Sequence, residues 1–561
     1  MARSHSHQFV GRRLRHAAGL LGVVTAMAFS PALSAAPTGV ATTTSVASHS
    51  PWQGAAWGDP QADAYAAGAR GVNVPARDPG SLFTVTNRIG ARTLWTQTDV
   101  NGRALTGQGV TVALLDSGVT AVPGLDGPGK VVQGPDLSIE AASGLGDRDT
   151  FGHGTYLAGI IAAHDPTPTK PRTGAPIVTS ASTELGVAPD AQLLALKLAT
   201  TDGSTDISQV IAALDWVSQH RNDNGMNVRV VNLSFGTESA QSYQLDPLAA
   251  AVENAWHHGI VVVVSAGNDG NAAALTDPAI DPYIIAVGAL DYGTATDGYT
   301  KPGVASFSNG GNAIRHPDLI APGSSIVSLR DPGSYVDVNH PSGLVAGDTS
   351  GRLFRGSGTS QAAAVVSGAA ALLLQQDPQL TPDQVKAALV STAQPLPNNS
   401  SYAAGAGQLN LVAASNEVAA IAAGRVSARD LANMVQRFPR ATGLGSLEAA
   451  RGGYHLVDPS GAELSGEVDV TGTAWNAVAW ATASANGTAW NGGDWVGVPW
   501  TGNGWADAQD WRSAPWTTAR WSTARWSSAE WSTARWSTAR WSTARWSTAR
   551  WSTARWSDAA W

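Results

Sequence analysis

Short runs of almost continuous apolar residues, separated by longer amphipathic stretches, constrain the fold of this chain more than any other feature. The runs are 110–115, 193–198, 228–233, 261–264 and 284–287. Apolarity that does not alternate is typical of strands buried on both faces, as in a parallel sheet. Helical patterns lie between the runs, notably at 207–220 and 247–258. This order predicts an α/β fold with a doubly wound, mostly parallel sheet and flanking helices.

The strand and helix pattern extends from residue 89 to about residue 415. With 561 residues, of which 43% are apolar, the chain is long enough for one large core and several additions. Parallel α/β sheets bind their ligands at the carboxyl ends of the strands. Chemistry-bearing residues are therefore expected where the apolar runs end, and Asp116 directly follows the first of them.

Three short motifs at the ends of buried elements contain the residue types of a catalytic triad. Asp116-Ser117-Gly118 closes the first strand, Gly152-His153-Gly154-Thr155 opens another apolar run, and Gly358-Thr359-Ser360 opens an alanine-rich helix. A serine hydroxyl is a poor nucleophile at neutral pH and needs an adjacent base with an oriented partner. In this interpretation Ser360 supplies the hydroxyl, His153 the base and Asp116 the carboxylate. Each motif alone is typical of a turn or a helix start, but together they predict a serine peptidase.

A fourth motif, Ser265-Ala266-Gly267-Asn268, follows the strand at 261–264. The side-chain N–H of Asn268, together with the backbone N–H of Ser360, would donate to the oxyanion of a tetrahedral intermediate. Asp147 and Asp149 lie just before His153, and we interpret them as a solvated turn. The alternative, a cation site, would need several converging oxygens.

These four motifs, in this order, resemble those of the subtilisin-like (subtilase) serine peptidases, and the resemblance covers residues 89–415. It implies a peptidase that cleaves proteins or peptides and needs no cofactor for catalysis. Residues 231–236 resemble the segment that pairs with a bound peptide in that family. The substrate-binding residues implied by the resemblance are Ser234, Phe235, Gly236, Ala266 and Gly267. Structural calcium sites are frequent in the family, but no set of calcium ligands can be recognised in this sequence.

The N-terminus has the three zones of a secretory signal peptide. Arg12, Arg13 and Arg15 precede an uncharged run at 17–29, and small residues follow at 32–36. The uncharged run is too short to span a membrane comfortably. We predict a signal peptide at residues 1–36 and a pro-segment or flexible leader at residues 37–88, so that the protein is secreted and extracellular or associated with the cell envelope.

Composition excludes two classes of protein. The chain contains no cysteine, so disulfides cannot stabilise it outside the cell and thiolate chemistry is absent. Its net charge of −8 argues against a nucleic-acid-binding protein, which usually presents a strongly basic face.

After a linker or small appendage at 416–470, residues 471–561 form a tail with tryptophan at almost every fifth position. The tail holds seventeen of the chain's 22 tryptophans, and from Trp511 onward it is mostly Trp-Ser-Thr-Ala-Arg. Its eight arginines and five acidic residues give a net charge of +3, so the rest of the chain carries −11. A spacing of five matches neither a helix face nor a strand face. The sequence predicts a low-complexity, disordered tail, with a pentapeptide-repeat β-helix as the alternative.

Tryptophan and arginine together suit stacking on sugars and contact with anionic surfaces. Residues 471–561 are therefore predicted to contact the cell envelope or a polysaccharide. The rival interpretation of the whole chain is a cell-surface adhesin, a binding protein on a degraded peptidase scaffold that acts through the tail. Intact residue types at all four catalytic positions argue against that rival.

Overall fold

The computed structural model describes five long segments of the chain and one isolated pair of residues: 78–165, 184–292, 302–396, 402–457, 462–501 and 525–526. The predicted signal peptide, most of the predicted leader and most of the repeats lie outside these residues. All of the described residues belong to one compact unit, formed by residues 48–561. Within them, no helix is both long enough and apolar enough to cross a membrane.

Eight strands form the central sheet. Their order is β2-β3-β1-β4-β6-β7-β8, and β9 also pairs with β7. Every pair is parallel except β7 with β8. The strands are β1 Thr111–Asp116, β2 Val131–Asp136, β3 Gln192–Lys197, β4 Val228–Leu233, β6 Val261–Ser265, β7 Ile285–Asp291, β8 Gly303–Val304 and β9 Leu319–Pro322. The predicted mostly parallel sheet is confirmed, and each of the five apolar runs corresponds to one of its strands.

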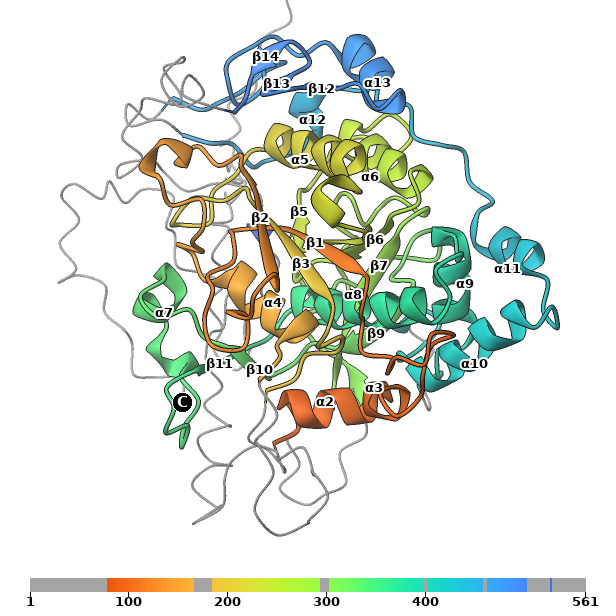
Figure 1. Cartoon of the computed structure of the whole chain (residues 1–561). Coiled ribbons are helices and arrows are strands. Elements are labelled where there is room, and N and C mark those ends of the chain that lie inside the picture. Colours follow the sequence, from red (N-terminus) through yellow and green to blue (C-terminus); the bar gives the residue numbers. More distant parts are fainter. Residues whose placement is uncertain are drawn as a thin grey trace, which may run out of the picture. The chain divides into compact units, whose positions relative to one another are not determined.

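Helices cover both faces of this sheet. Figure 1 shows α5 and α6 on one face and α4 and α8 on the other, so the predicted doubly wound α/β fold is confirmed. The helices are α2 Leu82–Arg88, α3 Ala91–Leu94, α4 His153–Ala162, α5 Ile207–His220, α6 Pro247–His257, α7 Tyr335–Asn339, α8 Thr359–Gln376, α9 Pro382–Ser391, α10 Leu411–Ala422, α11 Ala428–Val435, α12 Leu447–Arg451 and α13 Ala477–Ala485. The short strands outside the main sheet are β5 Phe235–Gly236, β10 Ile326–Leu329, β11 Leu353–Gly356, β12 Trp490–Asn491, β13 Asp494–Trp495, β14 Val498–Pro499 and β15 Arg525–Trp526.

Side-chain caps determine where several of these helices begin. Asp206 forms a capping box at the start of α5, and Thr381 does the same at α9. Helix α8 differs, because its N-cap residue Gly358 has no side chain to contribute. The Thr359 N–H instead donates to Asn268, which lies in the turn after β6. The first turn of α8 is therefore held by the loop that also belongs to the candidate site.

The folded part begins before residue 89. Helix α2 lies in the segment assigned from sequence to the leader, yet Leu82 and Val85 are completely buried in the main core. This short helix has a Ser81 cap and one apolar face. It was not predicted because the surrounding sequence is rich in alanine, glycine and proline and shows no sustained helical pattern.

The folded part also continues past residue 415, because α12, α13 and β12–β14 pack beside α5 and α6. Four tryptophans of the predicted disordered tail are at most 5% exposed there: Trp480, Trp490, Trp495 and Trp500. One is in a helix and the others are in or next to short strands, so the five-residue spacing is not the period of a single element. Residues 471–501 also contain only one charged residue, Asp494, which makes this part easier to bury than the arginine-rich repeats that follow.

Two buried carboxylates hold this C-terminal part against the sheet domain. Asp215 of α5 accepts the indole N–H of Trp480 and that of Trp495, each at 2.9 Å. Burial raises the pKa of Asp215 to about 6, although these hydrogen bonds favour its charged form. Asp206 pairs with Arg451 at 2.6 Å. Burial alone would raise the pKa of Asp206, but the Arg451 guanidinium and the hydrogen bonds from Ser208 together outweigh burial and hold that pKa below its usual value.

Candidate active site

Three neighbouring parallel strands end at one edge of the sheet and carry the sequence-predicted residues. Asp116 is the last residue of β1, Ser234 follows β4, and Asn268 lies in the turn after β6. Because β1, β4 and β6 are adjacent in the sheet, their carboxyl ends meet at the same edge. His153 begins α4, and Ser360 is the second residue of α8, a helix that contacts all three of these strands.

The carboxylate of Asp116 contacts the imidazole of His153. Nδ1 of His153 lies 2.8 Å from Oδ1 and 3.0 Å from Oδ2 of Asp116, and both side chains are completely buried. A carboxylate accepts, so Nδ1 carries a proton, and in the neutral imidazole it is Nε2 that carries the lone pair. The geometry thus prepares Nε2 to act as a base.

Ser117 connects the end of β1 to the start of α4. Its backbone N–H and its hydroxyl donate to Oδ1 of Asp116 at 2.8 and 3.1 Å. The same hydroxyl oxygen accepts the N–H of Gly154 at 3.0 Å. These contacts fix the orientation of the carboxylate relative to the helix that carries His153.

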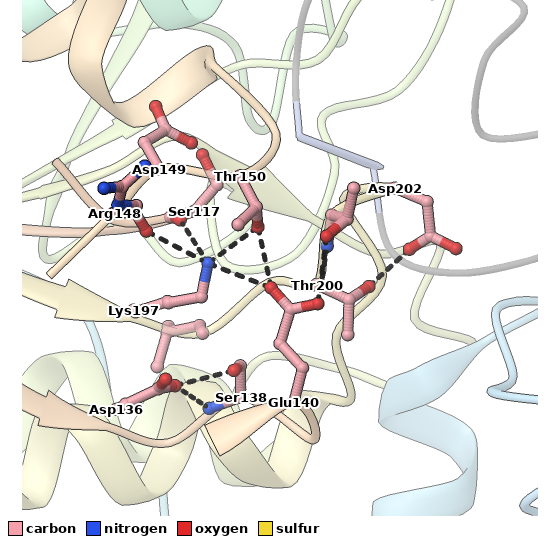
Figure 2. Close-up of polar contacts among 12 residues, drawn as sticks. Ser117, Asp136, Ser138, Glu140, Arg148, Asp149, Thr150, Lys197, Thr200 and Asp202 are labelled. Atoms are coloured by element: carbon pink, nitrogen blue, oxygen red, sulfur yellow. Dashed lines mark hydrogen bonds and ion pairs between the residues drawn. The ribbon is translucent and has the colours of Figure 1, made fainter. Parts of the chain in front are cut away.

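A buried lysine, Lys197, donates hydrogen bonds to this turn, as Figure 2 shows. It is the last residue of β3, opposite Asp116 in the strand register, and its side chain is 1% exposed. Its ammonium donates to the carbonyl oxygens of Ser117 at 3.3 Å and Arg148 at 3.1 Å. Its charge is balanced by Glu140, whose carboxylate lies 3.0 Å away. Lys197 therefore joins the loop after Asp116 to the loop before His153.

Sequence reasoning missed Lys197, although a signal was available. It is the one charged residue in the apolar run at 193–198. A lysine in a fully buried strand requires several acceptors, so its presence indicates a polar cluster at that point.

Asp149 is not part of a solvated turn, which corrects the sequence-based interpretation. Its side chain is buried and accepts the N–H groups of Gly152 at 2.6 Å and Thr155 at 2.7 Å. Burial raises the pKa of Asp149, and the neighbouring charge of Asp116 acts in the same direction. The carboxylate satisfies backbone groups at the start of α4 and so helps to place His153.

The amide of Asn268 is oriented by Thr359. The Thr359 N–H donates to Oδ1 of Asn268 at 2.9 Å, and the Thr359 hydroxyl lies 3.1 Å from the same oxygen. A backbone N–H only donates, so this contact identifies which atom of the amide is the oxygen. The Nδ2 group of Asn268 is buried and has no hydrogen-bond partner among the described residues. It is a donor held in place beside the residue that precedes Ser360.

The predicted substrate-binding residues lie on two segments next to the start of α8. The Ser234 hydroxyl donates to the Ser360 carbonyl oxygen at 3.5 Å, and β5 begins with the next residue, Phe235. The Ala266–Gly267 turn is tied to α8 by the Gly267 N–H, which donates to the Thr359 hydroxyl at 3.2 Å. Gly267 has a φ of 107°, and a Cβ atom there would lie 2.4 Å from Nδ2 of Asn309. The turn therefore requires glycine.

No group of three or more histidine, aspartate or glutamate side chains suited to a metal ion occurs within the described segments.

Comparison with known proteins gives a consistent family. Residues 107–407 match the model of the Subtilase family, Peptidase_S8. The serine protease AprX of Bacillus subtilis (strain 168) is 36% identical over 317 residues, which are 55% of this chain and 67% of that protein. Subtilisin BL of Lederbergia lenta is 33% identical over 316 residues, covering 56% of this chain and 93% of that protein. The crystal structure of a cold adapted subtilisin-like serine proteinase matches 57% of this chain and 97% of its own chain, with 29% identity and a TM-score of 0.40.

Proposed function

The chain belongs to the subtilase family of serine-type endopeptidases, and from that premise we propose the roles of its residues. Ser360 is the nucleophile, His153 the general base and then the general acid, Asp116 the orienting carboxylate and Asn268 the oxyanion donor. One observation carries this proposal: a buried carboxylate holds Nδ1 of His153 at 2.8 Å, which leaves Nε2 as the basic nitrogen.

In the first half of the reaction, Ser360 Oγ attacks the carbonyl carbon of the scissile peptide bond. Nε2 of His153 takes the hydroxyl proton, and Asp116 stabilises the imidazolium that results. Negative charge develops on the former carbonyl oxygen, where Nδ2 of Asn268 and the Ser360 N–H donate to it. Nε2 then gives its proton to the leaving amine, the C–N bond breaks, and an acyl-enzyme remains.

In the second half, water attacks the acyl-enzyme while His153 again acts as the base. The carboxylic acid product leaves, and the Ser360 hydroxyl regains its proton. The substrate peptide lies extended beside β5, with Ser234, Phe235 and Gly236 on one side and Ala266 and Gly267 on the other.

A fluorophosphonate probe tests this proposal, because it phosphonylates only a serine with an activated hydroxyl. We expect wild-type protein to be labelled, with the modification mapped by mass spectrometry to the peptide that contains Ser360. His153→Ala should abolish labelling, since the base is lost while the hydroxyl remains. Folded, fully processed wild type that stays unlabelled would favour the adhesin interpretation instead.

Asn268→Ala tests the oxyanion role. We expect kcat to fall about 100- to 1000-fold with little change in KM, because the lost N–H donates only when the oxyanion forms; this magnitude is the one known for subtilisin's own asparagine. The measurement is steady-state hydrolysis of a chromogenic peptide. Asn309→Ala is the control, since Asn309 contacts the same loop but its side-chain N–H groups donate to Asp269 and to the Ala274 carbonyl oxygen. Equal losses in both variants would indicate that Asn268 is only structural.

We further infer export of the protein, from the charged, apolar and small-residue zones within residues 1–36. We also propose that the tail contacts the envelope mainly through residues 502–561. Trp480, Trp490, Trp495 and Trp500 are buried against the domain, and Trp475 is the one tryptophan within residues 471–501 that is partly exposed.

A further inference from the structure

A short piece of the repeat segment, which we define as residues 511–561, pairs with the predicted substrate-binding strand. Arg525 and Trp526 form β15, which runs antiparallel to β5. In this register Arg525 is opposite Gly236, and Trp526 is opposite Phe235. Two residues predicted from sequence to bind an extended peptide are thus paired with a strand of the chain itself.

Strand β15 pairs with the edge of β5 at which an extended peptide ligand would also pair. The residue after β5, Thr237, exchanges backbone hydrogen bonds with Asp277, in both directions at 2.9 Å. Backbone polar groups of successive residues in a strand point to opposite edges. Gly236 therefore directs its N–H and C=O away from Asp277, toward the edge that β15 occupies.

This edge is close to the proposed nucleophile. Ser234, immediately before β5, donates to the carbonyl oxygen of Ser360 at 3.5 Å. Ser234 is itself held by Asn232, whose side chain donates to it at 3.1 Å. A strand on β5 is therefore one residue away from Ser234, which contacts Ser360, and the proposed function requires the substrate peptide at this place.

Chain length and charge both favour an intramolecular ligand. Twenty-three residues lie between Thr501 and Arg525, enough to span about 80 Å when extended. The Arg-Trp dipeptide occurs seven times in the repeat segment, so several copies can supply the same strand. The arginines also suit this face, because the carboxylates of Glu238 and Asp269 are exposed close to the two substrate-binding segments.

We propose that the Trp-Ser-Thr-Ala-Arg repeats are an intramolecular ligand of the active-site cleft and compete with peptide substrates by adding a strand to β5. The proposal rests on the proposed function, since it takes β5 to be the substrate-binding strand. Main-chain pairing of this kind gives affinity to an extended peptide whatever its side chains. A tether of this type gives an effective concentration near the millimolar range. A repeat that binds with a dissociation constant of about 0.1 mM would thus raise the apparent KM about tenfold.

The test separates the repeat segment from the domain without altering the sequence of either. The recognition sequence of an unrelated, site-specific cysteine peptidase is placed within residues 503–509 of the full chain. A fluorescent substrate peptide is then titrated into the Ser360→Ala form before and after the cut, with the released tail removed. We expect the affinity for the peptide to rise about tenfold after the cut. Unchanged affinity would overturn the proposal.

A second measurement does not depend on maturation of the Ser360→Ala form. In the catalytically intact chain, the cut should lower the apparent KM about tenfold and leave kcat unchanged. Before the cut, KM should not depend on enzyme concentration; a KM that rises with enzyme concentration would place the tail of another copy in the cleft. Loss of fluorophosphonate labelling in both forms would refute the proposed function, whereas labelling with equal KM values would refute only this inference.

A matched pair of peptides tests the strand pairing. A synthetic peptide with the sequence of residues 519–532 should compete with substrate for the cut enzyme. The same peptide N-methylated at the positions of Arg525 and Trp526 keeps every side chain but loses two N–H groups, and it should bind at least tenfold more weakly. Equal competition by both peptides would show that the repeats do not bind as a strand. Cleavage of the unmodified peptide would support the proposed binding site, because cleavage requires that a peptide bond of the repeat lie within reach of the Ser360 hydroxyl.

Discussion

Ser360→Ala is expected to reduce kcat by roughly a millionfold, the size of the loss known for the triad serine of subtilisin, a member of the same family. The substitution removes the atom that attacks the substrate and leaves the helix that carries it intact, because alanine is the best helix former. KM should change little, since the residues proposed to bind the peptide lie on β5 and on the turn after β6. Hydrolysis of a chromogenic peptide by purified, processed protein measures both constants.

Ser367→Ala provides the matched control for this prediction. Ser367 is also completely buried in α8, and its hydroxyl donates to the side chain of Asn232 at 2.9 Å. Loss of that hydrogen bond should cost about 1 kcal/mol of stability and leave kcat within about tenfold of wild type. A millionfold difference between two identical substitutions in one helix would separate chemistry from folding.

A double variant tests whether the proposed groups act as a unit. Once the Ser360 hydroxyl is absent, removal of the imidazole in Ser360→Ala/His153→Ala should cost almost nothing more. Losses that instead multiply would mean that His153 acts independently of Ser360, and the proposed division of roles would be wrong.

The sequence predicted the sheet and its main helices because those elements depend on local patterns. An apolar run long enough for one strand, with a cap or a glycine at its end, can be recognised from neighbouring residues alone. Helix α5 illustrates this, since its predicted range, 207–220, is the observed one, and its start is fixed by the Asp206 capping box. The positions of Asp116, His153 and Asn268 at element ends could be predicted for the same reason.

Contacts between distant segments could not be predicted in this way. Lys197 reaches residues 117 and 148, and Asp215 holds two indoles from beyond residue 470. Neither contact leaves a periodic trace in the sequence, because each joins loops whose relative positions are set by packing. The prediction for the tail failed for a related reason: its composition predicted disorder, whereas residues 477–499 contain α13 and three short strands that pack against the domain. The roles of Ser360 and its partners stay predictions until the kinetic measurements are made.

Asp116→Asn is expected to lower kcat by about 10,000-fold while the fold remains intact. The variant keeps the shape of the side chain but removes its charge, so the imidazolium formed during attack loses its stabilising partner. The amide geometry adds a second cost. The Ser117 N–H donates to Oδ1 at 2.8 Å, so the amide oxygen will take that position and the NH₂ group will take the position of Oδ2, 3.0 Å from Nδ1 of His153. Although the amide oxygen stays 2.8 Å from Nδ1, a donor at the second position competes with a protonated Nδ1 and raises the share of the tautomer with the proton on Nε2, which cannot accept the proton of Ser360.

Asp149→Asn separates this electrostatic role from loss of a buried carboxylate in general. Asp149 is also buried and lies at the same end of α4, but its two oxygens accept the backbone N–H groups of Gly152 and Thr155, whereas Nδ1 of His153 donates to Asp116. An asparagine retains one acceptor, so the loss should resemble that of a weakened helix cap, about 1 kcal/mol of stability and less than tenfold in kcat. Thermal unfolding measures the stability of both variants, and peptide hydrolysis measures their kcat. If Asp116→Asn and Asp149→Asn lowered kcat equally, Asp116 would be a structural residue of the α4 loop, and the base proposed for Ser360 would lack its partner.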